Sequence, residues 1–182
     1  MKVDLSFENH YEIKVLEDQP NALIHYFPGG STEGGKDGIL LQIVSAAGKK
    51  WIGMFAFGDM IRNGVMAVHS TPDPIKFCVV SRGAGYIVSS ENPALFEEVK
   101  TIPITEVRSV ISHNMLLFAD FTDLVAYGPN GIKWRTGRLG YDGFKILEIK
   151  KELLIGEFWS LRSDAMKKFA VDLSTGCMLE IT

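Results

Sequence analysis

The sequence predicts an all-β protein built from antiparallel meanders, arranged as about four blade-like units in a small or partial β-propeller. Short runs rich in β-branched, aromatic and Leu residues recur along almost the whole chain, and turn residues separate them. Long patterns of period 3.6, which would indicate helices, are almost absent. A β-sandwich or a β-barrel is the alternative that the same strand pattern allows.

Residues 114–136 show this pattern most clearly. Three strand-like runs lie at Met115–Ala119, Leu124–Gly128 and Ile132–Arg135, with turn residues in both gaps. The second gap reads Pro-Asn-Gly, in which Asn-Gly accepts positive φ at little cost and Pro presets φ just before it. The stretch therefore predicts an antiparallel meander with a tight second hairpin.

The rest of the chain contains similar runs, which predict one β domain over residues 1–182. N-terminal strands are expected within 1–27, a glycine-rich loop at 28–38, and repeated blade-like sheets over 39–182. A short helix is expected at 91–98, because Asn92 could cap it and Pro93 suits the first helical position. The further strands are expected at Val3–Phe7, Glu12–Leu16, Leu23–Phe27, Ile39–Val44, Trp51–Phe57, Val65–His69, Ile75–Val80, Tyr86–Ser89, Val99–Ile104, Val107–Ser112, Phe144–Ile149, Leu153–Trp159, Lys167–Asp172 and Cys177–Ile181.

The glycine-rich loop comes close to a phosphate-binding motif. Gly30 is followed by four residues and then by Gly35-Lys36. That motif requires Ser or Thr at the next position and a helix whose N-terminal amides face the phosphates. Here Asp37 follows, and a strand-like run comes after it. We therefore expect a flexible linker rather than a nucleotide site.

Parts of the chain repeat. Asn114–Phe121 aligns without a gap with Lys151–Phe158, at a spacing of 37 residues. Leu124–Gly131 aligns with Phe169–Gly176 at a spacing of 45, because residues 159–166 are expected to lengthen a loop. A weaker copy begins near Phe77. A period near 40 with about four short strands is typical of propeller blades, although any all-β meander has evenly spaced strands.

At these residues the chain resembles blades of the quinoprotein-like propeller repeat, in which a strand carrying Ala-Leu-Asp runs into a turn ending in Gly and a strand carrying Trp follows. Leu124–Thr136 is similar, and Phe169–Gly176 keeps the Asp and the Thr-Gly turn. Residues 134–143 are also similar to small, uncharacterised bacterial β-proteins that carry Trp-Arg-x-x-Arg-Leu and Asp-Gly. The resemblance implies architecture only, because the repeat specifies packing and turns. The chain has too few units for roughly six to eight blades, so no quinone cofactor is expected.

Composition excludes several classes of partner. Nineteen basic and 22 acidic residues give a net charge of −3, which provides no footprint for nucleic acid or an anionic membrane. Acidic and polar residues interrupt the first residues too early for a signal peptide, and no run approaches the ~18 apolar residues of a membrane-spanning helix. We therefore expect a cytoplasmic protein with neither nucleic acid nor membrane as partner.

Catalytic and metal-ligand patterns are not apparent in the sequence. The four histidines are scattered, with no pair at ligand spacing, and there is no Gly-x-Ser-x-Gly elbow. Cys78 and Cys177 both lie in apolar runs, so buried reduced thiols are expected, with a disulfide or a metal site as alternatives. We expect no metal and no catalytic residues.

The most suggestive cluster begins at Lys133. Strand alternation places Lys133 and Arg135 on one face and Ile132 and Trp134 on the other. In a structural interpretation, Trp134 packs between sheets and Arg138 pairs with Asp142. In a functional interpretation, a rim of this cluster binds an anion or an acidic peptide, since Trp, Tyr and Arg dominate interface hot spots. The candidate binding residues are Trp134, Arg135, Arg138, Tyr141, Asp142, Trp159 and Arg162.

These observations favour a non-catalytic binding or regulatory module whose partner is another protein. Its β scaffold would present loops at 58–64, 70–74, 136–143 and 159–166. One alternative is an enzyme with its site at the centre of the blade ring. Another is a small-ligand carrier, which needs an apolar cavity of roughly 300 Å³ or more. Unpaired strands in an incomplete ring also predict a homodimer.

Overall fold

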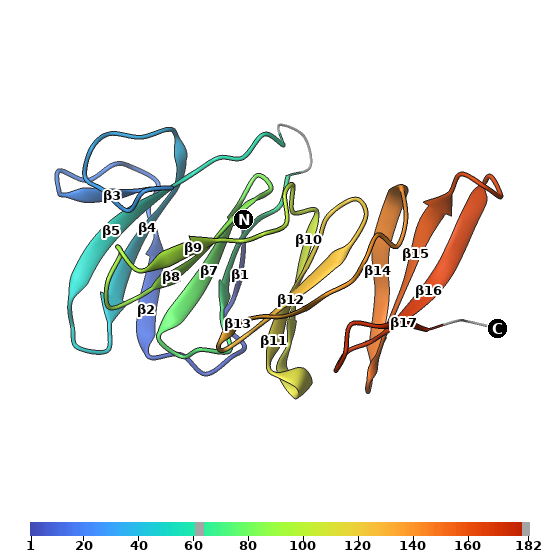
Figure 1. The fold of residues 1–182 in the computed structure, drawn as a ribbon. Helices are drawn as coiled ribbons and strands as arrows, with labels where there is room; N and C mark the ends of the chain where they lie inside the picture. The colour runs from blue at the N-terminus through green and yellow to red at the C-terminus, as the bar shows by residue number, and fades with distance from the viewer. Residues whose placement is uncertain (61–63, 180–182) are drawn as a thin grey trace. The chain divides into compact units, whose positions relative to one another are not determined.

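The computed structural model covers all 182 residues and describes residues 1–60 and 64–179. The chain is all-β, with four sheets of four or five strands that are blade-like meanders (Figure 1). In the described ranges the only helix is one 3-10 turn, Ile111–His113. Packing divides the chain into two compact units, Met1–Ile104 and Thr105–Thr182. The expectation of a single domain stays a prediction.

Unit 1 contains two sheets, here called sheet A and sheet B. Sheet A has the order β1-β6-β7-β8-β9, and sheet B the order β2-β4-β5-β3. Each sheet has one parallel edge pair, β1 with β6 and β3 with β5. The strands are β1 (Lys2–Asp4), β2 (Tyr11–Val15), β3 (Ile24–Phe27), β4 (Gly38–Ser45), β5 (Lys50–Ala56), β6 (Met66–Ser70), β7 (Lys76–Ser81), β8 (Ala84–Ser89) and β9 (Phe96–Glu98).

Unit 2 contains sheet C and sheet D, in which consecutive strands pair antiparallel throughout. Sheet C runs β10-β11-β12-β13 and sheet D runs β14-β15-β16-β17. The strands are β10 (Glu106–Val110), β11 (Met115–Ala119), β12 (Leu124–Gly128), β13 (Gly131–Arg135), β14 (Asp142–Lys150), β15 (Leu153–Ser160), β16 (Ala165–Asp172) and β17 (Met178–Leu179). The last two positions of the strand expected at Cys177–Ile181 lie outside the described residues.

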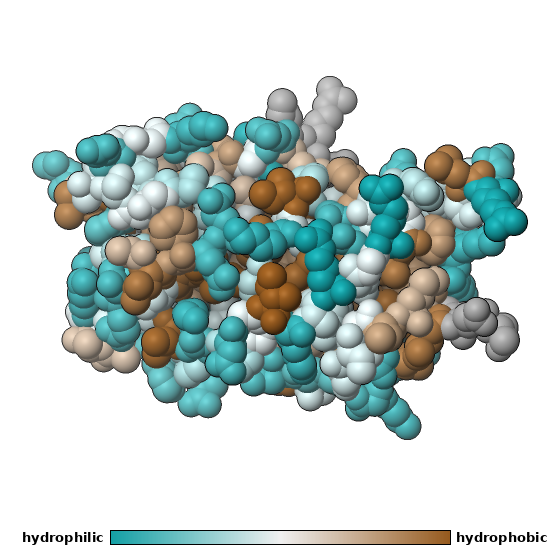
Figure 2. All heavy atoms as spheres, in the orientation of Figure 1, coloured by the Kyte–Doolittle hydropathy of each residue, from teal (hydrophilic) through white to brown (hydrophobic). Residues whose placement is uncertain are grey.

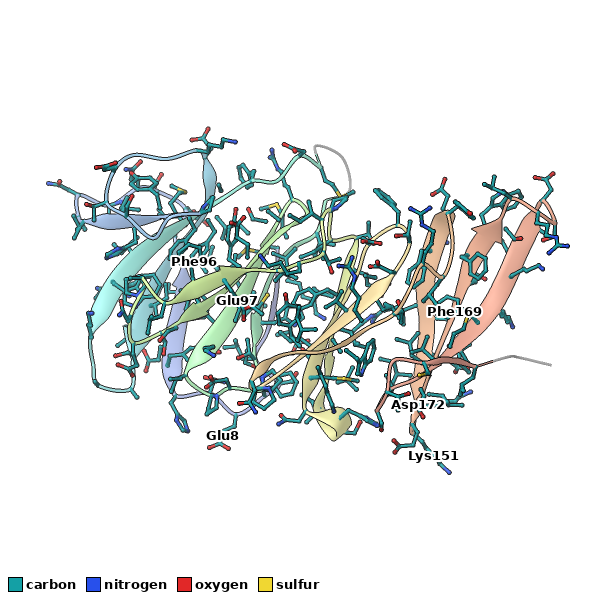
Figure 3. All side chains as sticks on the ribbon, in the orientation of Figure 1. Glu8, Phe96, Glu97, Lys151, Phe169 and Asp172 are labelled. Carbon is teal, nitrogen blue, oxygen red and sulfur yellow. The ribbon has the colours of Figure 1, made fainter. Side chains whose placement is uncertain are left out.

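Each unit buries a large core between its two sheets, and unit 1 has a further small cluster of Ile24, Leu40 and Ile52 on sheet B. In unit 1 this core is rich in aromatic rings, among them Phe27 stacked on Phe55 with centroids 4.6 Å apart. In unit 2 it is mainly aliphatic, around Leu117, Leu154 and Phe169. Figure 3 shows Phe169 among the strands of sheet D. Alternating apolar residues of facing strands therefore build both cores, as the period-two patterns predict.

The internal repeat corresponds to matching strands of sheets C and D. The first aligned segments contain β11 and β15, the second strands of their sheets. Asn114 and Lys151, which align with each other, both have positive φ, 48° and 49°. Gly131 and Gly176 also align, with φ of 102° and 73°. These non-extended residues turn the chain at the same point of each meander.

Two predictions near residue 95 are wrong. Asn92 makes only a single turn, accepting the Ala94 and Leu95 amides through its side chain and its carbonyl. The expected helix is replaced by β9, whose Phe96 packs edge-on against Phe27, with ring centroids 5.2 Å apart. The strand expected at 99–104 is absent from this described stretch, where Pro103 has no amide hydrogen to donate. Tertiary packing outweighs the local helix signal here.

The long loop expected at 159–166 is also wrong. The pairing of β15 with β16 continues through Trp159 with Met166 and Ser160 with Ala165. Only residues 161–164 form the turn, and Asp164 has a φ of 48° there. Trp159 is therefore on a paired strand, which fixes its backbone.

Candidate functional site

The structure divides the candidate binding residues into two groups. Trp134 and Arg135 lie on β13 in sheet C, whereas the other five belong to sheet D or its adjoining connections. Asp142 and Trp159 are on paired strands of sheet D, and Arg138, Tyr141 and Arg162 lie in the connections before β14 and after β15. Trp134 is buried, and its indole Nε1 donates to the Leu173 carbonyl at 2.8 Å. Gly176 lies so close that an added Cβ would be 2.7 Å from the Trp134 ring. Trp134 thus packs between sheets C and D, as its structural interpretation predicted.

The alternation predicted for β13 is interrupted by a bulge. Tyr127 pairs with Ile132 and Ala126 pairs with Trp134, which leaves Lys133 as an extra residue. Ile132 and Trp134 therefore lie on opposite faces, and Ile132 is 50% exposed. The prediction that they share a face is wrong, because one inserted residue reverses the side-chain order.

Arg135 stabilises a loop of sheet C. Its guanidinium lies 2.9 Å from the Asp123 carboxylate. Burial raises the pKa of the Asp123 carboxyl, the Arg135 hydrogen bond opposes this rise, and the Asp120 charge adds to it. Asp120 in turn accepts the backbone amides of Thr122 and Asp123. The Arg135 side chain therefore stabilises this turn.

The remaining candidates meet at the end of sheet D. Asp142 pairs with Trp159 across β14 and β15, and the Arg138 guanidinium carbon lies 5.2 Å from the Tyr141 ring centroid. No ion pair joins Arg138 to Asp142, two residues that the structure does describe. The Asp142 carboxylate instead accepts the Gly143 amide at 2.7 Å. The expected Arg138–Asp142 pair is replaced by a cation–π contact.

Two apolar residues at this end were missed in the sequence. Leu161 is 67% exposed in the β15–β16 turn, and Met166 is 44% exposed opposite Trp159. A signal was present, because Leu161 follows Trp159 by two residues and Met166 follows Arg162 by four, but the loop expected at 159–166 concealed it. Figure 2 shows hydrophobic and strongly hydrophilic residues together at the end where Figure 1 places this turn. We call this group the sheet D patch: Arg138, Tyr141, Asp142, Trp159, Leu161, Arg162 and Met166.

Unit 1 contains a pocket of about 550 Å³ that strand patterns did not predict. Its wall includes the glycine-rich loop. Two backbone hydrogen bonds hold this loop near its ends: the Tyr26 amide donates to the Ser31 carbonyl, and the Phe57 amide donates to the Asp37 carbonyl. Strand β4 follows this loop, so no helix N-terminus faces it, and the motif is not a phosphate-binding loop. The residues that line the pocket are Tyr26, Phe27, Pro28, Ser31, Glu33, Gly34, Gly35, Lys36, Ala56, Phe57, Gly58, Asp59, Gly83, Ala84, Tyr86, Ile102 and Pro103.

Two rows of residues look like catalytic arrangements. Asp4, His69 and Cys78 lie opposite one another across β1, β6 and β7. Cys78 and His69 are fully buried, and burial raises the pKa of the Cys78 thiol, which disfavours the reactive thiolate. Cys177 is exposed, so the expectation that both thiols are buried is wrong.

The second row joins Ser112, His113 and Glu152 in turns of unit 2. The Ser112 hydroxyl lies 2.9 Å from His113 Nδ1, and Glu152 lies 2.8 Å from His113 Nε2. The Glu152 side chain is 67% exposed, whereas acyl transfer depends on a water-excluded site. Within the described ranges, no group of three acidic, His or Cys side chains could hold a metal. No helix there is long and apolar enough to cross a membrane.

No protein-family model matches the chain, and no curated protein matches it in sequence. Similar solved structures include the N-terminal domain of Nup159, at 12% identity and a TM-score of 0.44, covering 100% of this chain and 53% of that one. A chain in the structure of an S. cerevisiae Dbp5 variant bound to Nup159, a Gle1 variant, IP6 and ADP is 14% identical, with a TM-score of 0.45 and coverage of 97% and 50%. This chain spans about half the length of each. These scores are too low for any property of those proteins to be carried over.

Proposed function

We propose that this chain is a non-catalytic binding module that holds an acidic segment of another protein against the sheet D patch. One observation supports this most: the patch exposes Tyr141, Leu161 and Met166 together with two arginines, on the paired strand β16 and in the connections next to β14 and β15. Tyr141 alone is 59% exposed. Large apolar side chains that gather at a surface with arginines are typical of protein interfaces.

The chemistry of the patch favours an acidic partner. Arg138 is held over the Tyr141 ring, so a flat cation and its aromatic support are already in place before binding. Arg162 adds a second guanidinium. Each guanidinium can form bidentate hydrogen bonds with a carboxylate. Lys167 and Lys168 are exposed on the neighbouring strand β16. Two acidic residues, Asp142 and the exposed Asp164 of the β15–β16 turn, lie within this basic surrounding, and the Asp142 carboxylate accepts the Gly143 amide.

The test is capture of a partner from a lysate of the protein's own cells, with a matched set of variants. One variant reverses charge with Arg138→Glu and Arg162→Glu, and another removes apolar contacts with Tyr141→Ser and Leu161→Ser. The control carries Ile132→Ser and Lys14→Glu, also at exposed positions but outside the patch. We expect one partner to be recovered by wild type and control, and lost by both patch variants. Equal recovery by all four proteins would overturn the proposal.

Self-association and location stay predictions. The expected homodimer would make the sedimentation coefficient rise with concentration, and a monomer at all concentrations would contradict it. The expected cytoplasmic location would be checked by fractionation of the source cells.

A further inference from the structure

We propose that the pocket of unit 1 binds a flat, uncharged aromatic molecule, independently of the sheet D patch. Its volume of about 550 Å³ lies within the ~300–1,000 Å³ typical of small-molecule sites. It also exceeds the roughly 300 Å³ that a small-ligand carrier needs. All lining residues belong to unit 1, so the pocket is complete within that unit.

The floor of the pocket is apolar and aromatic. Phe27 and Tyr86 are buried at 2% and 3% exposure, and Ala56 lies beside them. The Tyr86 hydroxyl already donates to the Ala56 carbonyl at 3.1 Å, so its polar atom is satisfied without a ligand. Burial raises the pKa of Tyr86 to about 12, with the Glu98 charge adding to the rise, which agrees with a dry floor. Such a floor suits an apolar ring system.

The mouth of the pocket includes exposed apolar residues. Ile102 is 68% exposed there, next to Pro103, and Tyr26 and Phe57 contribute rings to the wall. A bound aromatic molecule would cover Ile102, which water otherwise surrounds. Four aromatic side chains line the pocket, Tyr26, Phe27, Phe57 and Tyr86. They favour a flat aromatic ligand over a branched aliphatic one, because stacked and edge-on aromatic pairs gain stability beyond their buried area.

Charges of both signs stand at the rim. Glu33, Lys36 and Asp59 line the pocket, and the guanidinium of Arg82, which is not itself a lining residue, lies 3.9 Å from the centroid of the Phe57 ring. With two acids near two cations, the rim offers hydrogen-bond partners but no net attraction for an ion. A charged ligand would lose hydration on entering and gain little in return. The ligand is therefore uncharged, with polar atoms at its edge.

The glycine-rich loop gives the wall its shape. At Gly35 an added Cβ would be 2.6 Å from the Tyr26 ring, so the loop backbone lies directly against this ring. At Gly137 of unit 2, outside the pocket, an added Cβ meets nothing within 4 Å. Neither residue has positive φ, so both tolerate alanine in their backbone conformation. Gly35→Ala would displace the wall, and Gly137→Ala is its matched control.

The experiment uses N-phenyl-1-naphthylamine, an uncharged aromatic probe whose fluorescence rises in apolar sites. Its comparison probe is 1-anilinonaphthalene-8-sulfonate, which has the same ring body with one negative charge. We expect saturable binding of the uncharged probe to the full chain at one site, and at least threefold weaker binding of the sulfonate. Equal affinities for the two probes would overturn the uncharged class of ligand, and no fluorescence rise with folded protein would overturn the site.

Variants locate the probe. Ile102→Ser should weaken binding of the uncharged probe about fivefold, the loss expected for one aliphatic side chain at the mouth. Ile132→Ser, at an exposed position in unit 2, should leave the affinity unchanged. Gly35→Ala should weaken binding, whereas Gly137→Ala should leave it unchanged. Unchanged affinity in both Ile102→Ser and Gly35→Ala would place the probe elsewhere and overturn the proposal, whatever the outcome of partner capture.

Discussion

In both compact units a buried tryptophan joins the two sheets through one hydrogen bond, but the strand orders of the sheets differ. In unit 1 the Trp51 indole donates to the Ser90 carbonyl at 2.7 Å, and in unit 2 the Trp134 indole donates to the Leu173 carbonyl at 2.8 Å. Both bonds join residues 39 positions apart. Each tryptophan is buried in the core of its own unit. Trp51 thus links sheet B to the segment that follows β8 of sheet A, and Trp134 links sheet C to the segment that follows β16 of sheet D.

The two units differ in the sequence separation of the strands that they pair. Unit 1 adds β1 beside β6 and β3 beside β5, both in parallel, whereas unit 2 pairs only consecutive strands. The core of unit 1 is denser in aromatic contacts, such as the Trp51–Phe77 pair with centroids 6.0 Å apart. The non-consecutive strands bring the glycine-rich loop over this core and form the pocket. The simpler meanders of unit 2 instead present an exposed sheet end, the sheet D patch.

The largest effect is expected from removing either tryptophan. Trp51→Ala and Trp134→Ala should each lower the free energy of unfolding by about 3–5 kcal/mol, through lost burial and the cavity that remains. Trp→Phe keeps most of the ring but leaves a carbonyl without its donor, so a loss of about 1–3 kcal/mol is expected. Urea unfolding followed by circular dichroism measures both. A large loss at one tryptophan and none at the other would show that the two are not equivalent.

Acid should distinguish the units through His69 of unit 1. Burial lowers the pKa of His69 to about 4, although the Asp4 charge acts in the opposite direction and the Lys2 charge adds a little. In the unfolded chain His69 is therefore protonated below about pH 6.5, whereas in the folded chain it is protonated only below about pH 4. Stability from this group is complete above pH 6.5 and falls as the pH decreases to 4, by up to about 3 kcal/mol.

Urea unfolding at pH 7, 5.5 and 4 measures this slope, and a His69→Gln variant is its control. Asp4 affects stability only at lower pH than His69. Burial opposes ionisation of the Asp4 carboxyl, but hydrogen bonds from Ser6 and Lys2 bring its pKa below the usual value. The variant should lose most of the slope between pH 6.5 and 4. An identical slope in the variant would assign the acid sensitivity to other groups.

A smaller effect separates the two aligned glycines of unit 2. Gly131→Ala should cost about 1–2 kcal/mol, because φ is positive there but an added Cβ meets nothing within 4 Å. Gly176→Ala carries the same backbone cost and also drives a methyl group into the Trp134 ring. Thermal unfolding should therefore rank Gly176→Ala as clearly the more damaging. The reverse order would argue against the close packing of Trp134 on this turn.

The smallest effect concerns the two thiols and involves no change in stability. Ellman's reagent should modify Cys177 in the folded protein, because that side chain is exposed. Cys78 is fully buried and should react only as fast as the protein opens. Cys78→Ala and Cys177→Ala variants assign the two phases. Rapid reaction of both thiols in the folded state would contradict the burial of sheet A.

Much of the fold could be predicted from the sequence, and the exceptions have physical causes. Period-two runs placed most strands within one or two residues, since burial on one face of a strand leaves a local signal. The parallel positions of β1 and β3 leave no such signal, because their partners lie more than 20 residues away. The helix expected at 91–98 failed because β8 and the Phe27 ring select an extended chain for Phe96.

The candidate site was predicted only in part. The sequence named Arg138, Tyr141 and Trp159, whose types are typical of interfaces, but it grouped them with Trp134, which is buried in the core of unit 2. Ile132 is exposed because β13 contains a bulge. A bulge changes the pairing register of the strand, and the alternation of apolar and polar residues does not reveal such a change. The pocket of unit 1 was missed because it forms where non-consecutive strands and loops converge.

The central claim is that the sheet D patch serves recognition and not the fold. The most direct measurement compares the Arg138→Glu and Arg162→Glu double variant with wild type, in thermal stability and in partner capture from the same preparation. We expect a melting temperature within about 2 °C of wild type, as is usual for exposed positions, together with loss of the partner. A variant that is clearly destabilised, or one that retains the partner at full yield, would contradict it.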